Sequence, residues 1–400
     1  MSDIFIPNFR FKKYTSKLVK TKLSKIATFN PKSSLPENFK YIDLESVLGT
    51  ELVSYREEMR ESAPSRAQRV AQKGDVFYQM VRPYQKNNYL FDLNENNYVF
   101  STGYAQLRPK VDSAFLLARL QEEGFVNKVI ERCTGTSYPA INSKDLSRIS
   151  ITIPEDLEEQ SAIGSLFRTL DDLLSSYKYN LANYQSLKAT MLSKMFPKAG
   201  QTVPEIRLDG FEDEWGKYYL GDVFEQVSNY IEPSVENELW SLTVEKGLTP
   251  KTDRYKRDFL VKKNDKFKKV DVNEFVYNPM NLTLGALDLN DNEVTISVSG
   301  YYVVMKNRDI EKFDNDFLKI LLKTTYAIYQ YKQFATGTLI EKQRVQFPTF
   351  SEIPFYLPLI AEQHALGAYF SNLDNLIAAL QEKIYQLETL KKKLLQDMFI

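Results

Sequence analysis

The chain has almost no cysteine and almost no histidine. Its 400 residues include one cysteine, Cys133, and one histidine, His364. A single cysteine excludes a disulfide bond within the chain and is typical of proteins in a reducing compartment. These two residues also fall short of the ligand set that a zinc site needs. We therefore expect a cytoplasmic protein without a bound metal, in which His364 is a surface or interface residue.

The sequence also lacks the features of a membrane protein, a secreted protein or an ATPase. No run approaches the roughly 18 apolar residues that a membrane-spanning helix needs. The residues that follow Met1 do not have the charged and apolar regions of a signal peptide. No Gly-x-x-x-x-Gly-Lys-Ser/Thr loop is present, so any ATP chemistry would belong to a partner.

A catalytic site is missing as well. The segment Asn278-Pro279-Met280 matches part of the Asn-Pro-Pro-Tyr motif of amino-methyltransferases, but it lacks the second proline and the aromatic residue. No glycine-rich cofactor loop precedes it. The adjacent carboxylates of Asp171 and Asp172 diverge on a helix, which makes them poor acid–base partners. We expect a noncatalytic chain without a cofactor of its own.

Charge is balanced overall and concentrated locally. The chain has 52 basic and 52 acidic residues, so a nucleic-acid surface would have to be a local one. Residues 10–25 contain seven basic residues and no acidic one, and residues 246–270 contain ten basic and three acidic residues. Each cluster is either an ordinary solvated face or a surface that binds nucleic acid.

What the sequence does contain is an internal repeat. Glu159-Gln160 corresponds to Glu362-Gln363, 203 residues later, and the same offset holds without a gap as far as Phe196 and Phe399. Self-similarity of this kind is read before single motifs because it determines the architecture. Two copies of one segment, each preceded by a dissimilar stretch, indicate two modules placed symmetrically.

Both copies are predicted to be long helices. Each has apolar residues alternating three and four positions apart, which is the coiled-coil pattern. A helix of roughly 38 residues would be about 57 Å long. The apolar stripes are Ile163, Phe167, Leu170, Leu174, Tyr177, Leu181, Tyr184, Met191 and Met195 in the first copy, and Leu366, Phe370, Leu373, Ile377, Leu380, Ile384, Leu387, Leu394 and Met398 in the second.

The repeat favours pairing of the two helices within one chain, although a homodimeric coiled coil is the alternative. Lys188 and Lys391 interrupt the two stripes at the same place. A polar residue in such a stripe can fix the register of the helices. The alternative is that both lysines extend into solvent near the helix ends.

The segment before each helix is predicted to be a compact module of mixed α/β structure. Strands are expected at residues 75–78 and 98–101 in the first module and at 274–277 and 294–298 in the second. Helices are expected at residues 113–121 and 317–333. The module starts correspond at an offset of 197 residues, as Arg10 and Arg207 do, and the module ends also correspond, whereas the interiors do not align. Shared edges with different interiors suggest one scaffold that presents two different binding surfaces.

The repeated motifs resemble the specificity subunit of type I restriction-modification systems. The matching elements are the Glu-Gln-x-x-Ile/Leu helix start, the Leu-Asp-x-Leu step at Leu170 and Leu373, and the ending Leu-Lys-x-x-x-Leu-x-x-Met-Phe that closes at Phe196 and Phe399. Each motif is weak by itself. Duplication in register, with a variable module before each copy, makes the pattern fairly specific.

The resemblance implies a fold and a division of the chain. It implies target recognition domains at residues 1–153 and 201–357, and long helices at 154–200, with a linker, and at 358–400. The helices would pair as an intrachain antiparallel coiled coil with pseudo-twofold symmetry.

The resemblance also implies a function. The chain would read a bipartite target in double-stranded DNA, with one half per domain, and would dock two modification (methyltransferase) subunits and possibly two restriction (translocase-nuclease) subunits. S-adenosylmethionine, ATP and Mg would belong to those partners. Two rival interpretations are a noncatalytic scaffold whose modules bind protein and a fragment of a self-contained restriction-modification enzyme.

Basic and amide side chains of the two modules are the candidates for contact with DNA, because they can bind phosphates and base edges. In the first module they are Arg56, Arg60, Arg66, Gln68, Arg69, Arg82, Asn87 and Arg108. In the second module they are Lys251, Arg254, Lys256, Arg257, Lys262 and Lys263.

Overall fold

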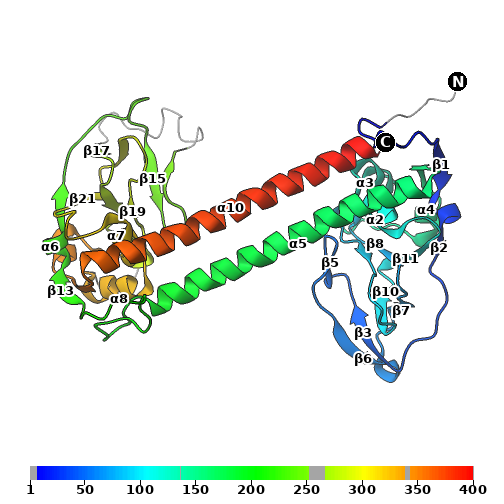
Figure 1. The fold of residues 1–400 in the computed structure, drawn as a ribbon, viewed down its shortest axis with the longest axis horizontal. Helices are drawn as coiled ribbons and strands as arrows, with labels where there is room; N and C mark the ends of the chain where they lie inside the picture. The colour runs from blue at the N-terminus through cyan, green and yellow to red at the C-terminus, as the bar shows by residue number, and fades with distance from the viewer. Residues whose placement is uncertain (1–6, 136, 252–265, 338–342, 400) are drawn as a thin grey trace. The chain divides into compact units, whose positions relative to one another are not determined.

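The computed structural model describes residues 7–135, 137–251, 266–337 and 343–399. By its internal contacts the chain divides into two compact units (Figure 1). Unit 1 consists of residues 1–180 and 380–400, and unit 2 consists of residues 181–379. Each unit therefore contains one module, the start of the long helix that follows this module, and the end of the other long helix. The boundaries between the two units lie within the long helices, whereas the domain boundaries expected from the sequence lie at the ends of these helices.

The first module, module one, begins and ends in the same two-stranded sheet. β1 (Leu18–Lys22) pairs antiparallel with β12 (Ser150–Pro154), which leads into the first long helix. A one-turn helix, α1 (Leu23–Ile26), follows β1 directly, and the backbone N–H of Leu23 donates to the carbonyl oxygen of Ile149 at 3.0 Å. This sheet fixes both ends of module one beside the start of the long helix.

Two four-stranded sheets form the body of module one. The first sheet is antiparallel and has the order β2 (Ala27–Phe29), β11 (Tyr104–Pro109), β8 (Val76–Gln79) and β9 (Tyr89–Leu90). The second sheet has the order β6 (Arg56–Met59), β3 (Asn38–Ile42), β10 (Tyr98–Ser101) and β7 (Ala67–Val70), with β3 and β10 parallel. The rings of Phe77 in β8 and Phe100 in β10 stack with centroids 3.6 Å apart, so the core joins the two sheets.

Short helices and a small hairpin complete module one. The hairpin is β4 (Val47–Leu48) with β5 (Glu51–Leu52), and the helices are η1 (Arg60–Ser62), η2 (Pro83–Gln85), α2 (Ser113–Gln121), α3 (Glu123–Ile130) and α4 (Ser143–Ser147). Helix α2 packs on β8 and β9. Its N-cap is Asp112, whose carboxylate accepts a hydrogen bond from the backbone N–H of Phe115 at 2.8 Å, as expected at a helix start.

The second module, module two, repeats the same topology. Its outer sheet pairs β13 (Gly216–Tyr219) with β22 (Pro354–Leu357), and α6 (Leu220–Val223) follows β13. Its central sheet has the order β14 (Phe224–Val227), β21 (Val303–Asn307), β18 (Phe275–Tyr277) and β19 (Leu287–Leu289). The other strands form the pairs β15 (Trp240–Thr243) with β16 (Gly247–Pro250) and β17 (Phe267–Val270) with β20 (Ile296–Ser299). A parallel bridge between Leu239 and Ser297 connects these pairs, as β3 and β10 are connected in module one.

The helices of module two correct one prediction. Residues 317–333 were expected to form one helix, but they belong to two helices, α7 (Asn315–Leu321) and α8 (Thr325–Phe334). Thr324 begins α8, because its hydroxyl accepts a hydrogen bond from the backbone N–H of Ala327. The remaining helices of the described part are η4 (Leu282–Leu284) and α9 (Phe347–Ser351).

The two repeated segments are long helices, as predicted. α5 (Leu157–Lys194) has 38 residues and α10 (Ile360–Met398) has 39. The predicted apolar stripes are buried in the first turns of both helices and half-buried or buried beyond them. In unit 1 the end of α10 runs antiparallel to the start of α5 (Figure 1). The start of α10 and the end of α5 are likewise joined within unit 2.

Candidate nucleic-acid interface

A buried ion pair attaches module one to the first turn of α5. The carboxylate of Glu159 is 1% exposed and accepts hydrogen bonds from Nε and Nη2 of Arg10, at 2.6 and 2.7 Å, and from the hydroxyl of Ser16. The next side chain, Gln160, donates to the carbonyl oxygen of Pro154 and accepts from the backbone N–H of Asp112. The first two residues of the repeat therefore connect α5 to the module in front of it.

Unit 2 contains the same junction. Glu362 accepts hydrogen bonds from Arg207, with Nε at 2.9 Å. Gln363 donates to the carbonyl oxygen of Pro358 and accepts from the backbone N–H of Asp314. These contacts give a structural reason for the repeated Glu-Gln motif and for the matching arginines at the two module starts.

One glycine in each helix allows the helix to approach its module closely. A Cβ atom on Gly164 would lie 2.4 Å from Oδ1 of Asp112 and 2.6 Å from the backbone nitrogen of Phe115. On Gly367 it would lie 2.9 Å from Oδ1 of Asp314. Each glycine thus faces the capped start of a module helix, α2 or α7.

The repeated Met-Phe endings dock onto the other module. In unit 1 the ring of Phe399 lies 5.8 Å from the rings of both Phe115 and Phe167. In unit 2 the ring of Phe196 lies 5.8 Å from that of Phe317 and 5.7 Å from that of Phe370. Each helix consequently begins on its own module and ends on the other one.

The two lysines that interrupt the apolar stripes make equivalent ion pairs. Lys391 pairs with Asp171 in unit 1, and Lys188 pairs with Asp374 in unit 2. The repeat offset relates the four residues to one another. The lysines do not simply extend into solvent, because each reaches a carboxylate of the opposite helix.

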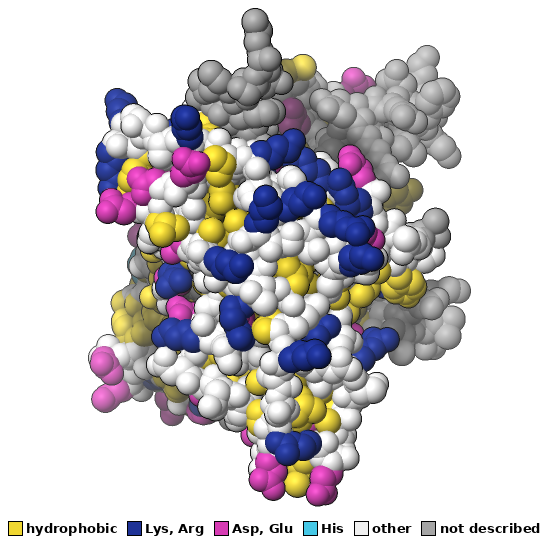
Figure 2. Space-filling view, turned by 90° about the vertical axis from the view of Figure 1, so that its right-hand side faces the viewer, with side chains coloured by type: hydrophobic (Ala, Val, Ile, Leu, Met, Phe, Trp, Pro, Cys, Tyr) yellow, Lys and Arg dark blue, Asp and Glu magenta, His cyan; other side chains and the backbone are white. Residues whose placement is uncertain are grey.

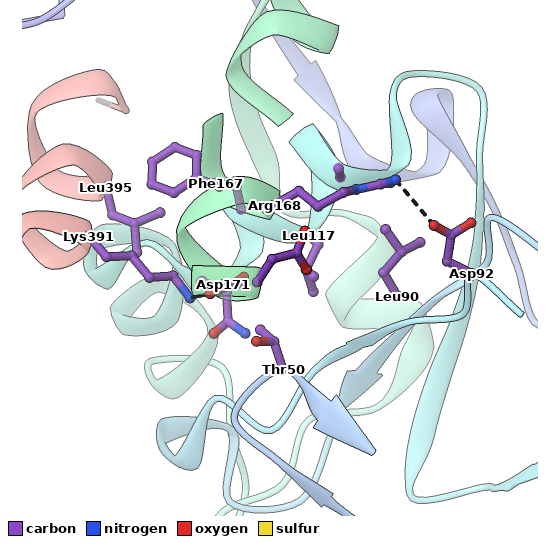
Figure 3. Close-up of a pocket in the computed structure, with 13 residues that line it drawn as sticks. Thr50, Leu90, Asp92, Leu117, Phe167, Arg168, Asp171, Lys391 and Leu395 are labelled. Atoms are coloured by element: carbon purple, nitrogen blue, oxygen red, sulfur yellow. Dashed lines mark hydrogen bonds and ion pairs between the residues drawn. The ribbon is translucent and has the colours of Figure 1, made fainter. Parts of the chain in front are cut away.

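A cavity of about 180 Å³ lies beside the ion pair of unit 1. Figure 3 shows Lys391 directed at Asp171, while Arg168 turns to Asp92, with Nη1 3.2 Å from Oδ2. Between these charged groups the walls are mainly apolar and include Leu117. The cavity belongs to the junction of module one and the helix pair.

Three of the predicted DNA-contacting residues lie at edge strand β7: Arg66 directly precedes the strand, and Gln68 and Arg69 lie within it. Arg66 and Gln68 are exposed, and Arg69 is half-buried. Gln68 donates to the carbonyl oxygen of Ser65 at 2.8 Å. The Nε of Arg69 is buried and has no hydrogen-bond partner within the described residues, and burial lowers the pKa of this guanidinium. The strand thus brings two cations and one amide together at a sheet edge.

Arg56 and Arg60 lie at the opposite edge of the same sheet, Arg56 in edge strand β6 and Arg60 at the start of η1, which follows β6. Arg56 is 61% exposed, and its guanidinium lies 3.6 Å from Asp43 and over the ring of Tyr41. Arg60 donates to the carbonyl oxygen of Leu35. These arginines are partly satisfied by module one itself.

Arg82 and Asn87 line a groove of module one that also contains Gln85. The Arg82 guanidinium lies 4.3 Å from the ring centre of Tyr138, which is 63% exposed. Asn87 accepts a hydrogen bond from the backbone N–H of Gly49 at 2.9 Å. An arginine on an exposed aromatic ring is suited to stacking with bases or binding phosphate.

Arg108 is held in an internal network. Its Nε and Nη2 atoms each lie 2.9 Å from the carboxylate of Asp75, which is 1% exposed. Gln106 donates to the same carboxylate at 2.7 Å. Much of the hydrogen-bonding capacity of Arg108 is therefore used inside module one.

Module two places few of its predicted residues in the described part of the chain. Lys251 is half-buried after β16. The other five lie outside the described residues: Arg254, Lys256, Arg257, Lys262 and Lys263. DNA contact by the predicted residues of both modules stays a prediction.

The structure points to three lysines at β17 that sequence reasoning did not select: Lys266 directly before the strand, and Lys268 and Lys269 within it. By topology β17 corresponds to β7, and the pairing register places Lys269 where module one has Arg69 and Lys268 where it has Ala67, because Gln68 is skipped at a bulge. Lys266 directly precedes β17, as Arg66 directly precedes β7. Lys268 donates to the carbonyl oxygen of Tyr302, and burial lowers its pKa. The sequence does contain a signal for these lysines, because all three lie in the basic cluster at residues 246–270.

The structure does not favour chemistry at the single cysteine of the chain. Burial raises the pKa of the Cys133 thiol, which disfavours the reactive thiolate. His364 is 60% exposed, as expected. Among the described residues no group of His, Cys, Asp and Glu is arranged to hold a metal ion, and no helix is long and apolar enough to cross a membrane.

Comparison with known proteins gives a consistent result. The model of the type I restriction modification DNA specificity domain matches residues 60–183 and 212–389. The chain is 23% identical over 342 residues to the type I restriction enzyme MjaVIII specificity subunit of Methanocaldococcus jannaschii, covering 82% of this chain and 73% of that protein. It is 29% identical over 141 residues to the HindI specificity subunit of Haemophilus influenzae, covering 34% of this chain and 30% of that protein.

Two solved structures have a similar fold. The S subunit of a type I restriction-modification system from M. genitalium has a TM-score of 0.62 at 14% identity, covering 99% of both chains. A chain from a study of complex assembly and conformational transition in the type I R-M system has a TM-score of 0.52 at 19% identity, covering 96% of this chain and 98% of that one. At these identities the likeness is one of fold.

Proposed function

We propose a function on one premise: the chain belongs to the type I restriction modification DNA specificity family. The two matched segments include most of both modules and both long helices. The chain is therefore a specificity subunit of a type I restriction-modification system, and its role is recognition of DNA sequence. How it recognises DNA and what it assembles with form the proposal.

We infer that each module reads one half of a bipartite target in double-stranded DNA. The observation that carries this inference is that both modules have the same order of strands but different side chains at equivalent positions. At the edge strand, Ala67 and Arg69 of module one correspond in register to Lys268 and Lys269 of module two. Because base edges are distinguished by the donors and acceptors that face them, different side chains on one scaffold select different half-sites.

We further propose that two identical modification subunits bind the helix pair. Exposed leucines occur at repeat-equivalent positions, Leu173 with Leu376 and Leu187 with Leu390. In unit 1, Leu173 and Leu390 lie within two residues of the ion-paired Asp171 and Lys391, so they belong to the same level of the two helices. Leu376 and Leu187 have the same relation in unit 2. Two like apolar sites suit two copies of one partner.

Methylation, ATP hydrolysis and cleavage would then be carried out by the partner subunits. They would bring S-adenosylmethionine, ATP and Mg, while this chain supplies the DNA sequence specificity. The absence of nucleotide and methyltransferase motifs in the sequence supports this division of labour.

A methylome tests the proposal. The chain is co-expressed with the modification subunit encoded beside it in a host without adenine methylation, and modified adenines are mapped by single-molecule sequencing. We expect one split motif with two short defined halves and a fixed gap. Exchanging residues 201–357 for the module of another specificity subunit should change one half of the motif and leave the other half and the gap unchanged.

The rival interpretations give different results. A protein-binding scaffold would form a soluble complex with the modification subunit and yield no new methylated motif. A single undivided motif, or a motif that changes in both halves on exchange of one module, would contradict the assignment of one half-site to each module.

A further inference from the structure

The outer sheets of the two modules are equivalent in structure, but the chain segments around their first strands differ in charge. Leu23 and Leu220 occupy the same position, because each donates its backbone N–H to the isoleucine that precedes β12 or β22, Ile149 or Ile353, at 3.0 Å. This correspondence gives an offset of 197 residues for the first strand. Residues 10–25 contain seven basic and no acidic residues, whereas the equivalent residues 207–222 contain two basic and five acidic residues.

Five positive residues of module one lie together at one edge of its fold. In β1, Lys20 and Lys22 point away from the core, opposite Thr152 and Ser150 of β12. Lys25 lies on α1, which contacts α4, the helix that carries Lys144. We call this set the basic edge, and it consists of Lys20, Lys22, Lys25, Lys144 and Arg148.

The corresponding positions of module two are not basic as a set. On the first strand and helix, Lys20 corresponds to another lysine, Lys217, whereas Lys22 corresponds to Tyr219 and Lys25 to Asp222. Because Ile149 corresponds to Ile353, Arg148 corresponds to Glu352. The basic edge is therefore not a requirement of the fold, since module two builds the same elements without it.

The side chains of the basic edge are exposed and largely free of acidic partners. All five are exposed, and within the described residues the one ion pair among them joins Arg148 to Asp145, with 3.6 Å between Nη1 and Oδ1. Figure 2 shows the side of the molecule on which β1, β2 and α4 lie, with Lys and Arg spread over it and Asp and Glu mostly at its margins. Like charges at neighbouring positions repel one another, so a polyanion bound there would relieve this repulsion.

We infer that the basic edge binds the phosphate backbone of duplex DNA outside the half-site that module one reads. This inference rests on the proposed function. Lysines two residues apart on an antiparallel strand are separated by about 6.8 Å, which is about two base-pair steps of the DNA axis. Four of the five side chains of the basic edge are lysines, whereas protein–protein interfaces favour aromatic residues and arginine. Contact with phosphate that does not depend on DNA sequence needs only positive charge.

DNA binding by the two modules would then be asymmetric. Module one gains contacts with flanking DNA, while the acidic residues at the equivalent edge of module two, such as Glu214 and Asp222, repel it. The complex would therefore depend on flanking DNA on the side of module one and not on the other side.

Salt-dependent DNA binding by the complete complex with its modification subunits tests the inference. Four lysines of the basic edge are replaced in the variant K20Q/K22Q/K25Q/K144Q. The matched control K128Q/K217Q/K332Q/K383Q removes four exposed lysines from α3, β13, α8 and α10. Dissociation constants are measured by fluorescence anisotropy between 50 and 300 mM KCl, with duplexes that keep both flanks or lose one of them.

We expect the basic-edge variant to bind target and non-target duplexes about 10- to 100-fold more weakly at 100 mM KCl, with the salt slope reduced by about 3. Removing the flank next to the half-site of module one should abolish the difference between wild type and variant. Removing the other flank should preserve it, and the control should behave as wild type. The methylated motif should stay the same, because backbone contacts carry no sequence information.

Three results would overturn the inference. The first is an unchanged salt slope while the wild-type complex still prefers its target. The second is an equal loss in the control variant. The third is a variant that keeps its salt slope but loses a modification subunit or a head-to-tail association with a second copy, since the basic edge would then bind protein. Failure of the proposed function is distinct, because wild-type protein would then show no target preference.

Discussion

At the scale of single residues, the repeat preserves the contacts that join helix to module. Glu159 and Glu362 are both buried and both bind an arginine from the start of a module. Their role could not be read from the sequence, in which an acidic residue in the first turn fits a helix dipole equally well. The structure assigns them to a specific buried ion pair instead.

Replacing Glu159 with glutamine should destabilise unit 1. The guanidinium of Arg10 is 23% exposed and would lose its bidentate partner while remaining partly buried. Loss of one partner of such a pair costs about 2–4 kcal/mol of unfolding free energy. Urea denaturation of the E159Q variant should show this loss, and E158Q, which changes the exposed neighbour, should match wild type. Equal stability of all three proteins would mean that the ion pair does not support the junction.

A second residue-scale prediction concerns Gly164. Alanine inside a helix is normally about 1 kcal/mol better than glycine, so propensity alone predicts that G164A is stabilising. The structure predicts the opposite, because the new methyl group would lie 2.4 Å from Oδ1 of Asp112. Thermal unfolding should show a lower midpoint for G164A and an unchanged or higher midpoint for S165A, at an exposed position of the same helix. A stabilised G164A would show that the helix can move away from α2.

At the scale of elements, the sequence predicted the helices and many of the strands but not the arrangement of the module interiors. The offset of 203 residues and the apolar stripes determine α5 and α10, and the predicted strand at residues 98–101 coincides with β10. The common order of strands in the two modules was hidden, because inward-facing positions need only a hydrophobic residue of suitable size. The break at Thr324 was missed because helical periodicity continues on both sides of it.

The ion pair between Lys391 and Asp171 should couple the two long helices. Both side chains are partly buried, at 19% and 26% exposure, so a coupling free energy of about 0.5–1 kcal/mol is expected. A double-mutant cycle with K391A and D171A measures it by chemical denaturation. The cycle with K188A and D374A should give a similar value, since the repeat relates the two pairs. Zero coupling in both cycles would favour the view that these lysines are surface residues without a role in register.

Docking of the modification subunits should depend on the exposed leucines of the helix pair. The L173D/L390D variant places two charges in the apolar site of unit 1, and L187D/L376D does the same in unit 2. Each should reduce the number of bound modification subunits from two to one, as measured by light scattering after size-exclusion chromatography. The control T169D/E382K changes exposed charges on the same helices. Two bound subunits in both leucine variants would place the docking surface elsewhere.

At the scale of the whole molecule, the repeat gives the two helix endings equivalent docking sites, one in each unit. Phe399 fills a site formed by Phe115 and Phe167, and Phe196 fills one formed by Phe317 and Phe370. The two sites have the same chemistry. A fragment of residues 1–200 therefore contains one complete site, one Met-Phe ending, and the partners Asp171 and Lys188.

We predict that this fragment forms a homodimer in which the Met-Phe ending of each copy occupies the site of the other. Lys188 of one copy would take the place of Lys391 and pair with Asp171 of the second copy. Light scattering at micromolar concentration should give twice the mass of the fragment. The F196A variant should dissociate to monomers, because the aromatic ring that fills the site is removed, whereas Y179A, at a side chain that is 69% exposed, should remain dimeric. A folded fragment that is monomeric, or that dimerises equally well as F196A, would mean that the two helix endings are not equivalent despite their sequence.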